Sequence, residues 1–584
     1  MPAVEITHIE KSRGDRLLGG LWLDIPLAGQ SFDSYAVQVV GWVIGARRPV
    51  CRVRISSKDV LTAETLVQEL RDDVAAAYPR IRWAGTAGFA TAISVRGLPE
   101  KFEFQLEAVF EDGCCCPLAT IHGRHQPLPT GCVPRVQPIF VVAESKKGTD
   151  RLMPAVEISH IAKARRSDVL SGLWLDIPAA GQVFDSYAVQ VVGWAVGSQR
   201  PVSRVRIWSK DLVVGEALVQ ELRDDVAAVD PQIPWAGTSG FATAISVLGL
   251  PETFEFQVEA VFEDDSSCPL ATIRGRHRPL QTGYDPRFQP IFVTSLGRTG
   301  TTWLMQILSH HPEIVAYRSH PYEVWYGRYS LHQLKVNARP TDRCTSAAYH
   351  FFDDLRQSGS NPFYDFPLLR EPAMDHWLGR ERPQQLGQFC QASIDSFYAR
   401  VAESQGQPRA RFFVEKTLPD STPRLAWELY EGTKEVFLVR DFRDVACSIQ
   451  AFNAKRGTNE FGQQSARNDE EFFVGLGGSA SRLLADWQQR RDRAHLVRYE
   501  DLAGQPEPTL HALFDYLGLE HSPALMREVL AGASQESGEM REHRTSQDLS
   551  SSVGRWRTDL SGPQQQLCRE VFRDVLAGFG YDAR

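Results

Sequence analysis

In the first half of the chain, apolar and polar positions alternate along short runs that are separated by turn residues. Residues 187–194 and 203–208 are two such runs, and Gly, Pro or Asp-Asp lies between runs of this kind. Alternation with a period of two, broken at turn residues, is typical of antiparallel strands with one buried face. The pattern therefore predicts β-sandwich-like modules, with one short helix within residues 223–231.

This first half is an internal repeat. Residues 1–6 (Met-Pro-Ala-Val-Glu-Ile) recur as residues 153–158, and the match continues without a gap at an offset of 152 residues. It ends after residues 138–142, which copy residues 290–294. A match of this length indicates a tandem duplication whose edge lies within a predicted strand.

From residue 286 the pattern changes to short apolar runs that alternate with longer amphipathic segments. This alternation is typical of a parallel sheet covered by helices. Four of the runs, at 290–294, 411–416, 435–440 and 494–500, end on residues that can bind or react. Because the carboxyl ends of parallel strands meet at one edge of a sheet, we expect a single site there.

These patterns divide the 584 residues into four parts. We predict a β-sandwich-like repeat 1 at 1–132, a linker with a truncated strand at 133–152, repeat 2 at 153–285 and an α/β domain at 286–584. A chain of this length is expected to hold several hydrophobic cores. Four tryptophans of repeat 2 could stack on a sugar, but tryptophan is largely buried on average, so we expect most of them to pack in the core. They are Trp174, Trp194, Trp208 and Trp235.

Composition narrows the choice of partners and compartment. Charged residues make up 23% of the chain, and a net charge of −8 gives no reason to expect a nucleic-acid partner. There is no run of about eighteen apolar residues and no apolar signal-peptide core, so we predict no membrane span and a cytoplasmic protein. Four of the five cysteines in repeat 1 are replaced in repeat 2. Since metal sites and disulfide frameworks need their cysteines, we expect free thiols and no metal.

Residues 295–303 (Ser-Leu-Gly-Arg-Thr-Gly-Thr-Thr-Trp) connect an apolar strand pattern to a helical pattern. The free amides and the dipole of a helix N-terminus favour an anion, Thr301 and Thr302 add hydroxyl donors, and Arg298 adds a positive charge. The segment thus predicts a phosphate-binding loop. A P-loop NTPase is disfavoured because its G-x-x-x-x-G-K-[ST] spacing is absent, and a purely structural turn is the other alternative.

A second motif, at residues 435–448, ends an apolar run on Arg440 and carries Ser448 about two helical turns later. Together the two motifs resemble the nucleotide-binding signatures of bacterial-type sulfotransferases that use 3'-phosphoadenosine 5'-phosphosulfate (PAPS). The resemblance covers about residues 286–584 and implies a P-loop-like sulfotransferase fold. It implies that Arg440 and Ser448 hold the 3'-phosphate. It also implies that the first loop holds the 5'-phosphosulfate, through Arg298, Thr299, Gly300, Thr301 and Thr302.

The catalytic residues follow from the same resemblance. Glu323 follows the first predicted helix, where related enzymes place a catalytic glutamate, and His320 is the second candidate for the base. A glutamate base works best near neutral pH when partial burial raises its pKa. Lys416 and Arg298 are the candidates for stabilising the transferring group. The structural alternatives are a solvated or salt-bridged surface position for Glu323, and for Lys416 an ordinary strand-end ion pair with its neighbour Glu415.

Three further residues complete the predicted cofactor site. Tyr499 matches a Tyr-Glu motif that lies beside the nucleotide in related enzymes. Arg555 resembles the basic residue that returns to the 3'-phosphate in the closing segment of the family, and Ser546 is assigned to the same segment. Phe452 is a departure, because the tyrosylprotein branch carries a further arginine at this place.

These inferences predict a PAPS-dependent sulfotransferase that transfers a sulfuryl group to the hydroxyl or amine of an acceptor, such as a carbohydrate or a small metabolite. The N-terminal modules are expected to bind glycan or protein. The alternative is a non-catalytic protein that binds nucleotide and glycan. Turnover that depends on Glu323 and Lys416 would separate the two.

Overall fold

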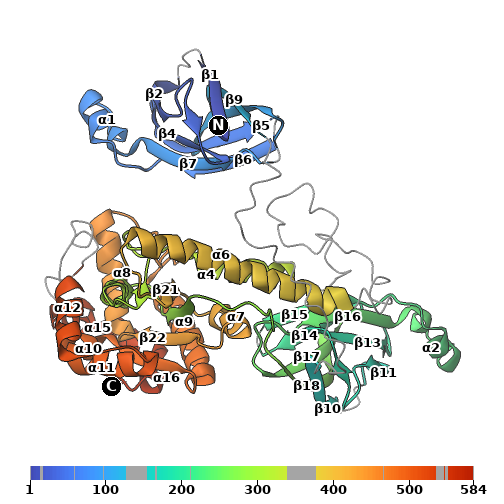
Figure 1. The fold of residues 1–584 in the computed structure, drawn as a ribbon. Coiled ribbons are helices and arrows are strands. Elements are labelled where there is room, and N and C mark those ends of the chain that lie inside the picture. Colours follow the sequence, from blue (N-terminus) through green and yellow to red (C-terminus); the bar gives the residue numbers. More distant parts are fainter. Residues whose placement is uncertain are drawn as a thin grey trace. The chain divides into compact units, whose positions relative to one another are not determined.

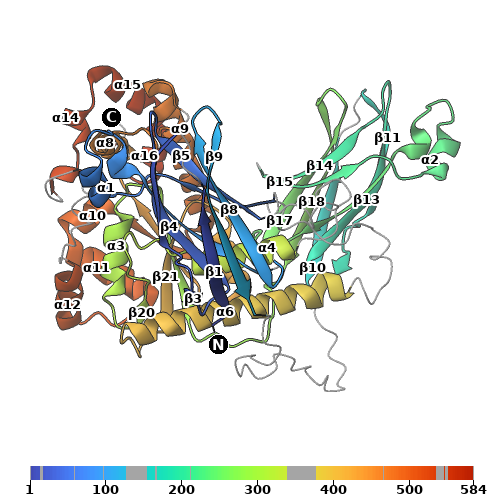
Figure 2. The same cartoon turned by 90° about the horizontal axis from the view of Figure 1, so that it is seen from above.

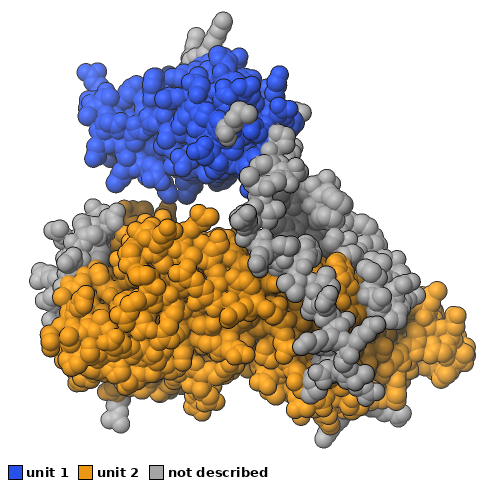
Figure 3. All heavy atoms as spheres, viewed as in Figure 1, with its two compact units in different colours: residues 1–150 blue, residues 151–584 orange. Residues whose placement is uncertain are grey.

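The computed structural model describes most of the chain and divides it into two compact units. The described residues are 2–12, 17–57, 60–96, 98–126, 154–164, 168–210, 212–338, 376–464, 466–533, 545 and 550–582. Unit 1 comprises residues 1–150, and unit 2 comprises residues 151–584 (Figure 3). The linker predicted at 133–152 lies outside the described residues.

Unit 1 consists of two antiparallel sheets that share one hydrophobic core (Figure 1). The sheets have the strand orders β3-β1-β9-β8-β5-β6 and β2-β4-β7. The strands are β1 (Val4–Lys11), β2 (Leu18–Ile25), β3 (Ser31–Phe32), β4 (Ala36–Gly45), β5 (Val50–Ser57), β6 (Val60–Leu66), β7 (Gly88–Ser94), β8 (Lys101–Phe110) and β9 (Cys115–His125). Val4 and Phe104 of the larger sheet and Val37 and Phe89 of the smaller one are at most 1% exposed. The alternation in sequence therefore buries one face of each sheet.

The N-terminal part of unit 2, called the second β module, has the same strand orders, β12-β10-β18-β17-β14-β15 and β11-β13-β16. The strands are β10 (Val156–Lys163), β11 (Leu170–Ile177), β12 (Val183–Phe184), β13 (Ala188–Gly197), β14 (Arg204–Ser209), β15 (Leu212–Leu218), β16 (Gly240–Ser246), β17 (Thr253–Val261) and β18 (Ser267–His277). Helices α1 (Asp72–Ala77) and α2 (Asp224–Val229) lie at matching positions of the two copies. Helix α2 confirms the short helix predicted within residues 223–231.

The tryptophans of the second β module differ in burial. Trp194 and Trp235 are partly buried against the cluster around Val196, as expected. Trp174 is an exception, because it is 50% exposed, with the Lys163 ammonium 3.1 Å from the centre of the indole ring. Trp174 lies on β11, an edge strand of the smaller sheet, which leaves room for an outward-facing ring.

The α/β region of unit 2 is built on a five-stranded parallel sheet with the order β20-β21-β19-β22-β23. Figure 2 labels β20 and β21 of this sheet. The strands are β19 (Gln289–Thr294), β20 (Ile314–Val315), β21 (Phe412–Thr417), β22 (Lys434–Val439) and β23 (Ala494–Arg498). All four apolar runs singled out in the sequence become strands, so the predicted parallel sheet is confirmed. The short strand β20 is an addition that its two residues did not signal.

Helices cover both faces of this sheet. Phe292 and Phe413 point to the face that packs on α4 and α6, whereas Ile291 and Val293 point to the face that packs on α3 and α11. The helices are α3 (Thr301–Ser309), α4 (Tyr326–Asn337), α6 (Arg382–Ser404), α7 (Thr422–Leu429), α8 (Phe442–Arg456), α9 (Asp469–Arg490), α10 (Tyr499–Gly504), α11 (Pro506–Leu517), α12 (Pro523–Ala533), α14 (Trp556–Asp559), α15 (Gly562–Val571) and α16 (Arg573–Gly578).

The second β module and the α/β region share one hydrophobic cluster, which includes Phe256 of the module and Phe292 of the sheet. Helix α6 extends from the parallel sheet to the module (Figure 1). Polar contacts support the junction: the Tyr187 amide donates to the Gly379 carbonyl oxygen at 2.8 Å, and the Gly249 amide donates to Glu428 Oε1 at 3.1 Å. The two parts of unit 2 thus pack as one body.

Candidate functional site

The phosphate-binding loop predicted from the sequence follows β19 and leads into α3. Its backbone turns through the left-handed region twice, at Arg298 (φ 68°) and at Gly300 (φ 94°), which precedes the first helical residue. A Cβ atom on Gly300 would lie 2.5 Å from Cδ2 of Tyr499. Glycine is therefore required at this position both by the backbone angle and by the ring that packs on it.

The three threonines of the loop have different environments. The Thr299 side chain is fully buried, and its Oγ1 donates to the Leu296 carbonyl oxygen at 2.9 Å. Thr301 and Thr302 form the first turn of α3, and Thr302 Oγ1 accepts a hydrogen bond from Lys416 Nζ at 3.0 Å. The Thr299 hydroxyl thus orders the loop, while Thr302 connects it to the end of β21.

Lys416, near the end of β21, is held by three acceptors. Besides Thr302, its Nζ donates to the Pro321 carbonyl oxygen at 2.5 Å and to Glu323 Oε1 at 3.3 Å. The Lys416 side chain is only 8% exposed, and burial lowers its pKa, whereas the carboxylate of Glu323 acts to raise it. The structure therefore brings together the phosphate loop, Lys416 and Glu323, three parts of the prediction that are far apart in the chain.

The Glu323 carboxylate lies at the solvent side of this group. Its side chain is 44% exposed. Tyr322 packs partly against the cluster below α3, and Trp325 is 44% exposed. The Glu323 carboxylate is therefore only partly buried. His320, the second candidate base, is half-buried on the same loop.

Glu415, the neighbour of Lys416, does not pair with it. Successive strand residues point to opposite faces, so the predicted alternative of a Glu415–Lys416 ion pair is wrong. The Glu415 carboxylate is fully buried and accepts hydrogen bonds from the amides of Gly327 (2.6 Å) and Arg328 (2.9 Å) and from the hydroxyl of Tyr398. Burial raises the pKa of Glu415 to about 7. The residue fixes the start of α4, and with it the loop that carries Glu323.

The second motif begins at the end of β22 with Arg440, which is 5% exposed. Its Nη1 donates to the Arg298 carbonyl oxygen at 3.2 Å, its Nη2 donates to the Ser552 carbonyl oxygen, and its guanidinium lies 4.6 Å from the centre of the Tyr499 ring. Its Nε is buried and has no hydrogen-bond partner among the described residues. A buried donor without an acceptor lowers the stability of the fold, and a bound anion would supply the missing acceptor.

Arg298 lies with this second motif. Its Nε donates to Ser448 Oγ at 3.2 Å. Burial, together with the positive charges of Arg440, Arg456 and Arg555, lowers the pKa of Arg298 to about 10. Four arginine side chains thus act on one another at the carboxyl edge of the sheet, an arrangement suited to a multiply charged anion.

The closing segment of the chain reaches the same place. Arg555 Nη1 donates to the Thr545 carbonyl oxygen at 3.1 Å, and Ser448 Oγ lies 3.1 Å from Thr545 Oγ1. The hydroxyl of Tyr499 is 2.8 Å from Ser552 Oγ. Arg555 and Tyr499 are therefore brought together with Arg440, whereas Ser546 lies outside the described residues.

Sequence reasoning missed the residue that positions this segment. Asp444, on the first turn of α8, accepts hydrogen bonds from the amides of Gly554 (2.7 Å) and Trp556 (2.9 Å). Burial raises the pKa of Asp444 to about 6. The pattern Arg440-Asp-Phe-Arg-Asp444 was visible, but no local signal indicates that an acid on one helix caps a turn more than a hundred residues away.

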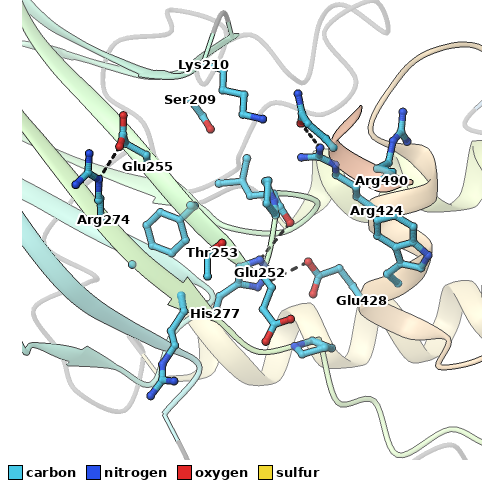
Figure 4. A pocket seen from close by; sticks show the side chains of 18 of the residues that line it. Ser209, Lys210, Glu252, Thr253, Glu255, Arg274, His277, Arg424, Glu428 and Arg490 are labelled. Atoms are coloured by element: carbon cyan, nitrogen blue, oxygen red, sulfur yellow. Dashed lines mark hydrogen bonds and ion pairs between the residues drawn. The ribbon is translucent and has the colours of Figure 1, made fainter. Parts of the chain in front are cut away.

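A separate cleft lies between the second β module and helices α7 and α9, with a volume of about 860 Å³ (Figure 4). It is lined by Arg274, which pairs with Glu255, and by Glu428, whose Oε1 lies 3.8 Å from His277 Nδ1. Arg493, immediately before β23, also lines it. The cleft therefore lies at the amino edge of the parallel sheet, opposite the loop and the arginines described above.

Among the described residues there is neither a metal-binding group nor a membrane-spanning helix. Within the described stretches of the chain, no group of three or more His, Cys, Asp or Glu side chains is arranged to hold a metal ion. Over the same residues, none of the helices combines the length and the apolar character needed to cross a bilayer.

The glycine loop, the arginine group and the lysine–carboxylate pair thus lie at the carboxyl edge of one parallel sheet. Residues 290–523 match the model of a sulfotransferase family. The family model covers β19 to the start of α12, and so includes both motifs, Glu323 and Lys416.

Individual relatives are more distant. The nodulation protein NoeE of Sinorhizobium fredii is 25% identical over 50% of this chain, and the alignment spans 65% of the relative's length. A sulfotransferase domain from the curacin biosynthetic pathway is 15% identical and covers 51% of this chain and 99% of its own, with a TM-score of 0.30. The mouse sulfotransferase SULT7A1, solved with PAP, is 12% identical and covers 51% of this chain and 87% of its own, with a TM-score of 0.28.

Proposed function

We propose that the protein is a sulfotransferase that takes the sulfuryl group from PAPS and transfers it to the hydroxyl or amine of an acceptor, with carbohydrates and small metabolites as the candidate classes. One observation carries this proposal. Lys416 Nζ lies 3.0 Å from Thr302 Oγ1, on the phosphate loop, and 3.3 Å from Glu323 Oε1. The anion site and a carboxylate able to accept a proton thus lie on either side of one buried cation.

The donor requires two anion sites, and the chain supplies both. The amides at the start of α3, with the hydroxyls of Thr301 and Thr302, suit the 5'-phosphosulfate. Since the Thr299 hydroxyl is buried, Thr299 and Gly300 would contribute through their backbone amides. The 3'-phosphate fits the second site, since Arg440 offers a buried Nε with no partner among the described residues.

The remaining ligands of the 3'-phosphate are proposed from contacts and from resemblance. Arg298, Ser448 and Arg555 join Arg440 there, with Tyr499 beside the nucleotide. Arg298 was expected to stabilise the leaving group as well, but its contact with Ser448 favours the 3'-phosphate side. Ser546 stays a ligand implied by the resemblance alone.

Sulfuryl transfer forms a bond between the acceptor oxygen and sulfur and breaks the bond between sulfur and the oxygen that bridges it to the 5'-phosphate. In this mechanism Glu323 accepts the acceptor proton, and His320 is the second candidate for that role. Lys416 donates a hydrogen bond to the bridging oxygen and offsets the charge that develops there. Thr302 and the Pro321 carbonyl oxygen orient Lys416, and no metal is required by these roles.

The β modules are proposed as tandem copies that bind glycan or partner protein, and the boundaries at 132, 152 and 285 stay predictions. So does the cytoplasmic location.

Calorimetric titration with adenosine 3',5'-bisphosphate, the desulfated product, tests the donor site. We expect binding in the micromolar range or tighter, no comparable binding of ATP, and a loss of about 100-fold in Arg440→Ala, which removes several charge-assisted hydrogen bonds. Arg467→Ala is the matched control, because its side chain is 87% exposed and pairs only with Glu471 among the described residues. No binding of the bisphosphate, or a preference for ATP, would remove the basis of the proposal.

A further inference from the structure

Two arginine guanidinium groups pack on the ring of Phe452. The guanidinium carbon of Arg298 lies 4.4 Å from the centre of the ring, and that of Arg456 lies 4.5 Å from it. Phe452 itself is buried, and Phe461 packs against it edge to face at 5.6 Å. An aromatic face attracts a guanidinium and limits its orientations, so this ring holds two cations at the edge of the site.

The positions on α8 explain why Arg456 can reach the site. Ser448, Phe452 and Arg456 are spaced by four residues, and side chains at that spacing lie on one face of a helix. Ser448 is already in contact with Arg298 at 3.2 Å. The face of α8 that begins with the proposed phosphate ligand Ser448 therefore continues through the aromatic ring to Arg456.

Within the described part of the chain, neither Arg456 nor Arg440 forms an ion pair with a carboxylate, whereas Arg555 pairs with Asp559. Arg456 is nonetheless close enough to act on Arg298 electrostatically. Like charges gathered in this way repel one another, and the repulsion is relieved when an anion binds among them.

We propose that Arg456 is a further ligand of the 3'-phosphate, and that Phe452 is the platform that presents Arg456 and Arg298 to it together. This inference rests on the proposed function. Arg456 follows Phe452 by one turn of the same helix, so its guanidinium and that of Arg298 both lie against the one ring. Two arginines on one ring can each donate planar hydrogen bonds, which suits a phosphate dianion better than a singly charged group.

The test compares two ligands on the full chain. Adenosine 3',5'-bisphosphate carries the 3'-phosphate, and adenosine 5'-phosphosulfate lacks it; the affinity of the weaker ligand is measured by displacement. Arg456→Ala is expected to weaken bisphosphate binding by about 10-fold, the effect of losing one charge-assisted contact, and to change the affinity for the 5'-phosphosulfate by less than about twofold. Arg456→Lys keeps the charge but not the planar group. Its affinity for the bisphosphate should lie between that of the unmodified chain and that of Arg456→Ala.

Phe452→Leu gives a second measurement, because it keeps Arg456 and removes the aromatic face. It should weaken bisphosphate binding by about 3-fold or more, in line with the loss of two cation–π contacts. Arg467→Ala should leave both affinities unchanged, and melting temperatures would show that each variant is folded. Equal losses for both ligands in Arg456→Ala, or no loss for the bisphosphate, would overturn the inference. Failure of the unmodified chain to bind the bisphosphate would instead overturn the proposed function.

Discussion

Lys416 joins three segments of the chain at the level of single residues. It comes from β21 and contacts the first turn of α3 and the loop that carries Pro321 and Glu323. A buried ammonium needs acceptors for its protons, and these three satisfy it. Its position near the reacting group therefore depends on the same contacts that hold the loop.

Replacing the side chain of Glu323 or of Lys416 should reduce turnover with little effect on donor binding. Glu323→Gln removes the proton acceptor, and we expect kcat to fall by about 10²- to 10³-fold. Lys416→Ala removes the cation at the bridging oxygen and should cost about 10²-fold or more.

Both effects are measured as sulfate transfer from PAPS, beside calorimetry with adenosine 3',5'-bisphosphate, whose affinity should change by less than about threefold. Glu470→Gln, on an exposed helix surface, is the control. Unchanged kcat in both variants would refute the assigned roles.

At the level of elements, α8 organises the proposed donor site. The helix begins at Phe442 with Asp441 as its N-cap, presents Ser448 and Phe452 to the site, and holds the segment around Arg555 through Asp444. Arg443 instead pairs with Asp441 and lies 4.0 Å from the Trp556 ring. One helix thus carries ligands of the site on one face and the anchor of the closing segment on another.

Loss of the Asp444 anchor should loosen the closing segment. In Asp444→Ala the amides of Gly554 and Trp556 lose their acceptor, which costs about 1–3 kcal/mol per buried group. Because Arg555 would no longer be held at the site, bisphosphate affinity should fall by about 10-fold.

Amide hydrogen exchange of residues 550–560 would report the local opening. Asp444→Asn, which keeps one acceptor oxygen, should have a smaller effect. The anchor would be disproved if exchange in this segment stayed as slow as in the unmodified chain.

At the level of the whole molecule, unit 2 combines the second β module and the α/β region around buried acids. Glu428 of α7 accepts a hydrogen bond from the Gly249 amide and faces His277 and Glu252 of the module. Burial raises the pKa of Glu428 to about 8, and lowers that of His277. The junction thus contains an acid that is largely protonated near neutral pH.

This shift predicts how stability depends on pH. A carboxyl with a raised pKa in the folded state stabilises the fold fully below its unfolded pKa of 4.5, and this contribution is lost as pH rises through about 8. We expect this group to lower the free energy of unfolding of unit 2 as pH rises from about 4.5 to about 8, by up to about 1.4 kcal/mol per pH unit, and to add no further slope well above pH 8.

Glu428→Gln keeps the acceptor for Gly249 and removes the titrating proton, so the decline should be shallower. Urea denaturation at a series of pH values would measure it. His277 acts in the opposite direction and at lower pH, where its burial opposes protonation. If the free energy of unfolding fell with pH equally steeply in the unmodified chain and in Glu428→Gln, the prediction would be contradicted.

Much of the α/β region could be predicted because its signals are local. Apolar runs marked β19, β21, β22 and β23, and the glycine and threonines after β19 marked the loop. The placement of candidate functional residues at strand ends followed from sheet topology, whereas the pairing of Arg440 with Ser448 came from the resemblance of the second motif. The burial of the Thr299 hydroxyl had no such signal, since it depends on which rotamer the packed loop leaves room for.

By itself, the amino-acid sequence determined the repeat, the alternation of strands and helices and the two nucleotide motifs, because periodicity and short-range sterics act between near neighbours in the chain. Only the tertiary structure decided that Glu415 and Lys416 face opposite sides, that Asp444 holds Gly554 and that Arg456 shares a ring with Arg298. These outcomes depend on contacts between segments that approach one another only after the chain has folded, and long-range packing and electrostatics leave no periodic mark in the sequence.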